Sequence, residues 1–126
     1  QGYGQTSETG LASYYNDTFE GKTTASGELF SQSKLTAAHR TLPFKTKIRV
    51  TNLENKHSVI VTINDRGPFI KGRILDLSKK AAAKLDFVDQ GVAKIKWQVL
   101  EKKYKNLFIV MTGYLDSLKI VCNLIN

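Results

Sequence analysis

In HSVIVTINDRGPF, residues 57–69, large apolar side chains alternate with other residues until the chain reaches a Gly-Pro pair. Val59, Val61 and Ile63 share one face and Ile60 and Thr62 lie on the other, which is the period of a β-strand with one buried face. Gly67-Pro68 ends the strand, because proline has no N–H to donate to a sheet. Asp65 and Arg66 are therefore expected at an exposed strand end, where functional side chains are often found.

The same two-residue alternation predicts strands on both sides of this segment. It recurs at residues 47–51 and 93–99, and residues 10–15 and 72–77 are further strand candidates. Ser78 can cap a short helix of alanines and lysines that follows it. Seven side chains on the apolar faces are expected to fill the interior: Val50, Val59, Val61, Ile63, Ile95, Trp97 and Val99. His57, which shares the apolar face of its segment, is expected to pack there too.

This pattern predicts one all-β domain. The chain has 126 residues, the size of a single domain. Five or six short strands with one small helix fit a barrel or a sandwich and leave too few helices for a βαβ fold. The single cysteine, Cys122, excludes a disulfide scaffold and a cysteine-based zinc site. No apolar run approaches 18 residues, so we expect no membrane span.

The charge of the chain is +8, and most of it lies in residues 31–100, which hold 14 basic and 5 acidic side chains. Such a body attracts polyanions, including nucleic acid, anionic membranes and acidic cell-wall polymers. Charge alone does not choose among them. The aromatic residues of a single-strand nucleic-acid platform are missing from the basic strands, and we expect no nucleic-acid partner.

Three groups of polar residues at turns are candidates for chemistry: residues 36–39, 64–69 and 73–78. Taken locally, each also has a plain structural explanation. Asp65 can pair with Arg66 or cap its own turn, and a lone histidine such as His39 is more often structural than catalytic.

Five ordered motifs within residues 10–100 resemble the rare lipoprotein A (RlpA) family of bacterial cell-wall proteins: GLASYY, TTASGELF, LTAAHRTLPFKTKIRVTNL, VIVTINDRGPF and GRILDLSKKAAAKL. The resemblance implies a six-stranded double-psi β-barrel with one or two short helices and a shallow open groove. We expect residues 1–9 to be a flexible lead-in and residues 101–126 a C-terminal extension of unknown role.

The resemblance also implies an activity, which is endolytic lytic transglycosylation of peptidoglycan. The enzyme would cut the β-1,4 bond after N-acetylmuramic acid, leave a 1,6-anhydro end and favour strands stripped of stem peptides. A carboxylic acid protonates the leaving oxygen, and a carboxylate then takes the proton from the 6-hydroxyl of the sugar. Neither a cofactor nor a metal is implied.

The family's catalytic positions fall on Glu28, His39 and Asp65. More distant relatives of the barrel, the plant expansins and membrane-bound lytic transglycosylase A, place a carboxylate at Asp76. The acid is therefore either Asp65 or Asp76. We expect His39, Asp65 and at least one of Glu28 and Asp76 to line one groove. If Asp65 is the acid, the Arg66 guanidinium must turn away from it, because a nearby positive charge favours the ionised carboxylate.

Candidate substrate-binding residues are Tyr14, Tyr15, Arg40, Arg66 and Arg73. Tyr14-Tyr15-Asn16 stands where relatives have Trp-Tyr-Gly, and a tyrosine there is expected to offer its ring to a sugar.

The alternative function is an expansin-like module that binds polysaccharide without cutting it. We expect a monomer in the bacterial cell envelope, either periplasmic or secreted. Its expected partners are the glycan strands of peptidoglycan and proteins of cell division or wall synthesis. No cysteine stands near the N-terminus of this chain to carry a lipid anchor.

Overall fold

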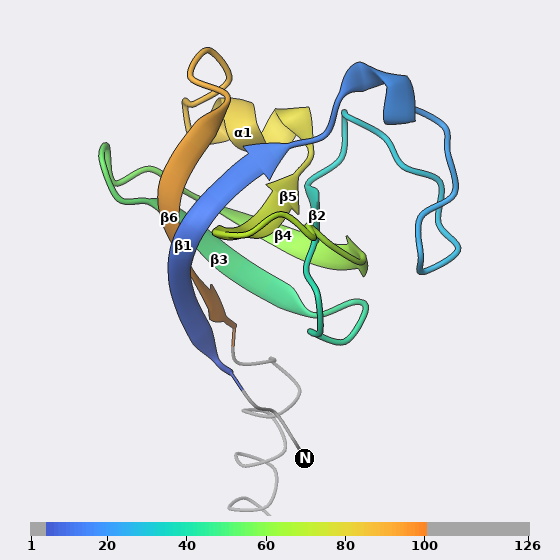
Figure 1. The fold of residues 1–126 in the computed structure, drawn as a ribbon, viewed down its shortest axis with the longest axis horizontal. Coiled ribbons are helices and arrows are strands. Elements are labelled where there is room, and N and C mark those ends of the chain that lie inside the picture. Colours follow the sequence, from blue (N-terminus) through green and yellow to red (C-terminus); the bar gives the residue numbers. More distant parts are fainter. Residues whose placement is uncertain (1–4, 101–126) are drawn as a thin grey trace, which may run out of the picture.

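The computed structural model describes residues 5–100, which form a closed barrel of six strands (Figure 1). The strands are β1 (Ser7–Tyr14), β2 (Thr36–Ala38), β3 (Lys47–Asn52), β4 (Ser58–Asp65), β5 (Arg73–Leu77) and β6 (Val92–Val99). A 3-10 turn, η1 (Asp17–Phe19), follows β1, and one helix, α1 (Lys79–Lys84), follows β5. The expected mainly-β barrel with short helices is confirmed. No helix among the described residues is long and apolar enough to cross a membrane.

The barrel mixes parallel and antiparallel neighbours. The order around it is β1-β5-β2-β4-β3-β6, and β6 closes the circle by pairing with β1. The pairs β1–β5 and β2–β4 are parallel, and the other four are antiparallel. Among the described strands, only β3 and β4 are both consecutive in the chain and paired, so the other connections lead to strands that are not neighbours. One of them, residues 20–35, runs beside β2 as an extended loop (Figure 1).

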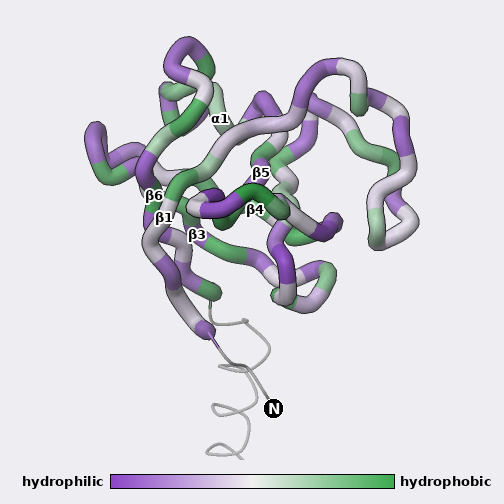
Figure 2. The backbone as a smooth tube through the Cα atoms, viewed as in Figure 1, coloured by the Kyte–Doolittle hydropathy of each residue, from purple (hydrophilic) through white to green (hydrophobic). Residues whose placement is uncertain are grey.

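The interior is apolar, as the alternation predicts. Of the seven side chains expected there, six are buried, and the seventh, Val99, is partly buried against the same core. Trp97 is fully buried, and its indole N–H donates to Glu8 Oε1 at 3.2 Å. Figure 2 shows hydrophobic residues along the strands and hydrophilic ones at the turns. The helix cap is confirmed, since Ser78 Oγ accepts the Ala81 N–H at 3.3 Å.

Three expectations about local structure are wrong. β1 begins at Ser7 and not at Gly10, because residues 7–9 pair with residues 96–98 of β6 and therefore belong to the barrel and not to the lead-in. Residues 36–38, grouped with a polar turn, form the short buried strand β2. His57 is exposed, because it lies in the turn before β4 and not on the buried face of that strand. The extension at 101–126 lies outside the described residues.

Candidate active site

Two aspartates lie in one row across the outer face of four neighbouring strands. Ser13 of β1 is the register partner of Asp76 of β5, Asp76 pairs with Ala38 of β2, and Ala38 pairs with Asp65 of β4. Register partners point to the same face of a sheet. With strands roughly 4.8 Å apart, Asp65 and Asp76 stand on either side of Ala38 with backbones roughly 10 Å apart.

This row faces away from the main core. Ala38 belongs to a small separate cluster with Tyr15 and Phe30, whereas its neighbour Ala37 packs in the barrel interior. Tyr15 follows β1, and Phe30 lies in the 20–35 loop. The loop therefore forms one wall beside the aspartates.

Asp65 is held by three hydrogen-bond donors. The Tyr15 hydroxyl donates to Oδ2 at 2.5 Å, and the backbone N–H groups of Ala25 and Arg66 donate to Oδ1 at 2.8 and 2.9 Å. Hydrogen bonds to an ionised carboxylate are among the stronger ones in proteins. Burial raises the pKa of Tyr15 well above its usual value, and the bond to Asp65 raises it further. Tyr15 is thus a neutral donor that fixes the Asp65 carboxylate.

Asp76 has a different environment. Burial raises the pKa of its carboxyl, and the negative charge of Asp65 adds to the increase. The Ser13 hydroxyl, which donates to Asp76 Oδ1 at 2.8 Å, and the positive charge of Arg73 oppose it. Asp76 therefore keeps a proton to a higher pH than an ordinary aspartate, as a general acid requires.

The Arg66 guanidinium turns away from the Asp65 carboxylate. Its Nη1 donates to the backbone carbonyls of His39 and Leu42, at 3.2 and 2.8 Å. The guanidinium also lies over the Phe44 ring, 4.0 Å from its centroid. The positive charge of Arg66 is thus held at the 39–44 turn and not beside the Asp65 carboxylate.

His39 is buried, at 4% exposure, and its imidazole points to the inside of the barrel. Nδ1 accepts the backbone N–H groups of Thr41 and Leu42 at 3.1 and 3.0 Å, so the ring proton must be on Nε2. Nε2 lies 3.6 Å from Glu8 Oε1, and the ring packs edge-on against Trp97. Burial lowers the pKa of His39, and Glu8 partly opposes this, which favours a neutral ring.

The His39 imidazole is therefore not beside the aspartates. Within residues 5–100, no direct hydrogen bond joins the imidazole to Asp65 or Asp76. The reason is strand alternation, because Ala38 points outward and the next residue inward. His39 still supports Asp65 through the backbone, since its N–H donates to the Asp65 carbonyl at 3.2 Å. We interpret His39 as a positioning residue.

Glu28 is exposed. It lies beside the row because it contacts Asn64, the residue of β4 that precedes Asp65. Its Oε1 accepts a hydrogen bond from Asn64 Nδ2 at 3.2 Å. The backbone N–H of Ser26 donates to the Asn64 carbonyl at 3.3 Å, so the 24–28 turn is attached to the end of β4. Among the described residues, Glu28 makes no hydrogen bond to either aspartate.

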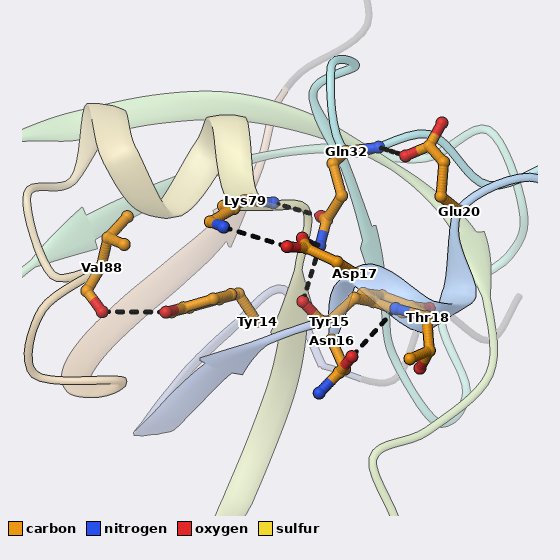
Figure 3. Close-up of polar contacts among 9 residues, drawn as sticks. All are labelled: Tyr14, Tyr15, Asn16, Asp17, Thr18, Glu20, Gln32, Lys79 and Val88. Carbon is orange, nitrogen blue, oxygen red and sulfur yellow. Dashed lines mark hydrogen bonds and ion pairs between the residues drawn. The ribbon is translucent and has the colours of Figure 1, made fainter.

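The two tyrosines point in opposite directions. Tyr14 donates to the Val88 carbonyl at 2.9 Å and packs against Phe87, on the α1 side of the barrel (Figure 3). Tyr15 stacks on Phe30 with ring centroids 4.2 Å apart and is buried. The buried Tyr15 ring is stacked on Phe30 and is not open to a sugar, whereas the Tyr14 ring is half-buried on another side of the barrel.

Gln32 holds the loop that carries Tyr15 in place (Figure 3). Its Nε2 donates to the Tyr15 carbonyl at 2.7 Å and to Asp17 at 3.1 Å, and its Oε1 accepts the Lys79 N–H at 2.7 Å. Lys79 Nζ also lies 3.3 Å from Asp17 Oδ2. One side chain thus ties the end of β1 to the start of α1.

The remaining arginines differ in position. Arg40 is exposed, next to His39, whereas Arg73 at the start of β5 is half-buried and acts on the Asp76 carboxyl. Sequence reasoning missed Ser13, Gln32 and Glu8. Ser13 could have been found from its place on the polar side of the first strand, but no local pattern pointed to Glu8 or Gln32.

Comparisons with known proteins agree with this fold. Residues 7–97 match a protein family described as "Lytic transglycolase". The chain is 48% identical over 97 residues to "Endolytic peptidoglycan transglycosylase RlpA" of Campylobacter jejuni, covering 77% of this chain and 35% of that protein. It is 50% identical to the protein of the same name from Rickettsia felis, covering 79% of this chain and 47% of the relative. The chain thus spans less than half the length of these curated relatives.

Solved structures share the barrel. A Streptomyces papain inhibitor is similar with a TM-score of 0.61 and 27% identity, over 75% of this chain and 94% of that one. An expansin of Clavibacter michiganensis is similar with a TM-score of 0.60 and 21% identity, over 76% of this chain and 51% of that one. At this identity the expansin supports the fold alone.

Proposed function

The chain belongs to the RlpA family of double-psi β-barrel lytic transglycosylases, and from this membership we propose that it cuts the glycan strands of peptidoglycan endolytically. The bond is the β-1,4 link after N-acetylmuramic acid, and the new end is a 1,6-anhydro sugar. Strands stripped of stem peptides are the preferred substrate. This substrate locates the protein in the bacterial cell envelope, on the periplasmic or secreted side.

The reaction needs a proton donor and a proton acceptor but no water. A carboxylic acid protonates the leaving O4 as the bond between C1 and O4 breaks. The 6-hydroxyl oxygen of the same sugar then bonds to C1 and gives up its proton to a carboxylate. One proton is delivered and one is recovered, so no net proton is consumed. When the donor and the acceptor are different carboxyl groups, the proton must pass from the acceptor back to the donor before the next cycle.

The row formed by Asp76, Ala38 and Asp65 is the observation that carries the proposal. It puts two carboxyl groups on one outer face, with only a small alanine between them. The raised pKa of Asp76 supports it as the proton donor. The three donors on Asp65 support it as the carboxylate that stabilises positive charge on the sugar and takes the proton from the 6-hydroxyl.

The other candidate residues have supporting roles in this proposal. His39 positions the 39–44 turn that binds Arg66. Glu28 contacts Asn64 and so lies at the edge of the row formed by the two aspartates. Arg40 and Arg73 are the arginines left to contact substrate, because the Arg66 guanidinium is bound to backbone carbonyls.

The experiment is digestion of purified sacculi, with and without stem peptides, followed by mass spectrometry of the products. The parent protein should release anhydro-muropeptides, whereas Asp65→Asn and Asp76→Asn should not. If the parent sediments with sacculi but releases no anhydro product, the chain is a binding module and the proposed activity is wrong.

A further inference from the structure

Two hollows lie next to each other on the outer surface, between the 20–35 loop and β4. Their volumes are about 600 and 380 Å³, and both are lined by Glu28 and Thr62, so they adjoin. Both are partly open to solvent, so they form a surface groove and not an enclosed cavity. We call the two together the lysine groove, since Lys34 lines the larger hollow and Lys45 the smaller.

The lysine groove leads to the aspartates. Thr36 of β2 and Thr62 of β4 are register partners that line the larger hollow. Ala38, between the two aspartates, lies two residues further along β2 on the same outer face, because the intervening Ala37 points into the core. At about 3.3 Å per residue the two positions are roughly 7 Å apart. A glycan in the groove can therefore continue across Asp65 and Asp76.

Each hollow is lined by a residue with a buried polar atom that lacks a partner. Thr36 lines the larger hollow and Asn64 the smaller, and neither Thr36 Oγ1 nor Asn64 Oδ1 makes a hydrogen bond within the described part of the chain. The two residues are only 8% and 4% exposed. An unsatisfied buried polar group costs roughly 1–3 kcal/mol, so such groups call for an explanation. Sugar hydroxyl and acetamido N–H groups are donors that would satisfy both atoms.

The groove carries excess positive charge. In addition to Lys34 and Lys45, Lys47 donates through Nζ to Thr62 Oγ1 at 3.0 Å, where the hollows meet. The one acidic residue of the lining, Glu28, is bound to Asn64. Among residues 5–100, the three lysines form no ion pair with a carboxylate. Three ammonium groups therefore face one carboxylate, which favours an anionic ligand.

Lys45 is held in a strained conformation. Its φ of 76° lies in the left-handed region, which disfavours side chains other than glycine. The backbone fixes it there, because its N–H donates to the Ile63 carbonyl at 2.8 Å. Strain of this kind clusters at ligand sites.

We propose that the lysine groove binds a glycan strand with free carboxylates, and that Lys34, Lys45 and Lys47 are its specificity-determining residues. The inference rests on the proposed function, which supplies the substrate class. The lactyl group of N-acetylmuramic acid has a free carboxylate only when no stem peptide is attached, since the peptide turns it into a neutral amide. Ion pairs between the lysines and the carboxylate at the lactyl position would then favour strands from which the peptide has been removed.

The test compares two ligands that differ only in this charge: peptide-free glycan strands, and the same strands with their carboxylates converted to methylamides. Binding is measured by fluorescence anisotropy on Asp65→Asn protein, so that the strands are not cut. A carboxylate bound to two or three lysines should give a preference of about ten-fold or more for the free form. Lys45→Gln combined with Lys47→Gln should abolish this preference, and Lys96→Gln, an exposed lysine of β6, should leave it unchanged.

Equal binding of the two ligands by the Asp65→Asn protein would overturn the inference. So would a lysine double variant that keeps the preference, or a control variant that loses it equally. Each of these results leaves the proposed function intact, because the proposed function fails only if the parent protein makes no anhydro product.

Discussion

Asp65→Asn is the substitution whose effects follow most fully from the contacts. The side chain keeps its shape, and its remaining oxygen can still accept the Ala25 and Arg66 N–H groups. The new amide can donate to the Tyr15 oxygen, which reverses the bond that the hydroxyl now makes. The three bonds to a charged carboxylate become three neutral ones.

The cost follows from that change. A hydrogen bond to a charged group contributes about 1.5–3 kcal/mol and a neutral one about 0.5–1.5 kcal/mol. Because Asp65 is only partly buried, we expect a total loss of about 1–3 kcal/mol, less than the ~5–15 kcal/mol that stabilises a typical domain. In a domain of this size that is a fall in Tm of roughly 5–20 °C. Cleavage should fall by about 10²–10⁴, the usual effect of removing an acid or base.

Circular-dichroism melting and mass spectrometry of digested sacculi measure the two effects. Asp89→Asn, at an exposed aspartate, is the matched control and should change neither. Cleavage by Asp65→Asn at the parental rate would show that Asp65 takes no part in the chemistry. A variant that is unfolded at 25 °C would show that the bond estimates are wrong.

Four further predictions concern Asp76, His39 and Tyr15. The folded state raises the pKa of Asp76, so above the usual 3.8 the carboxyl ionises in the unfolded chain before it does in the folded one. Urea denaturation should therefore show that the parent loses stability relative to Asp76→Asn as pH rises above 3.8. Nitrogen-15 NMR should show His39 neutral with its proton on Nε2. Titration of His39 at the usual 6.5 would contradict its burial and the hydrogen bonds that its Nδ1 accepts from the Thr41 and Leu42 N–H groups. The lowered pKa of His39 also predicts that stability falls as pH drops below 6.5, because the unfolded chain then takes up a proton that the folded ring does not. Tyr15→Phe keeps the stacking on Phe30 but loses the bond to Asp65, so urea denaturation should show a loss of about 1–3 kcal/mol together with slower cleavage; unchanged stability and activity would contradict the role given to Tyr15.

Much of the barrel could be predicted because its strands alternate. Val59, Val61 and Ile63 have the two-residue period that only a half-buried strand explains, and the structure buries all three. β2 could not be predicted in the same way. It has only three residues, Thr36 to Ala38, and all are buried, so no alternation is visible.

Motifs in the sequence name candidate site residues but do not give their geometry. Motifs pointed to Asp65, Asp76, Glu28 and His39, and strand register then decides which side chains share a face. Two register shifts, at Ala37/Ala38 and at Leu11/Ala12, set that register, and such irregularities leave no trace in composition. The pairing of His39 with Glu8, 31 residues earlier, depends on the closure of β1 against β6. Contacts of this kind arise only when the barrel forms.

The central claim is that this barrel cuts glycan by internal transfer to the 6-hydroxyl of the sugar and not by hydrolysis. Digestion of peptide-free glycan strands in water enriched in oxygen-18, followed by mass spectrometry, tests it most directly. The account predicts new ends that are one water lighter than a reducing sugar and carry no heavy oxygen, and it predicts that Asp65→Asn and Asp76→Asn produce none. Reducing ends labelled with oxygen-18 would show hydrolysis and contradict the account, as would an absence of new ends with the parent protein.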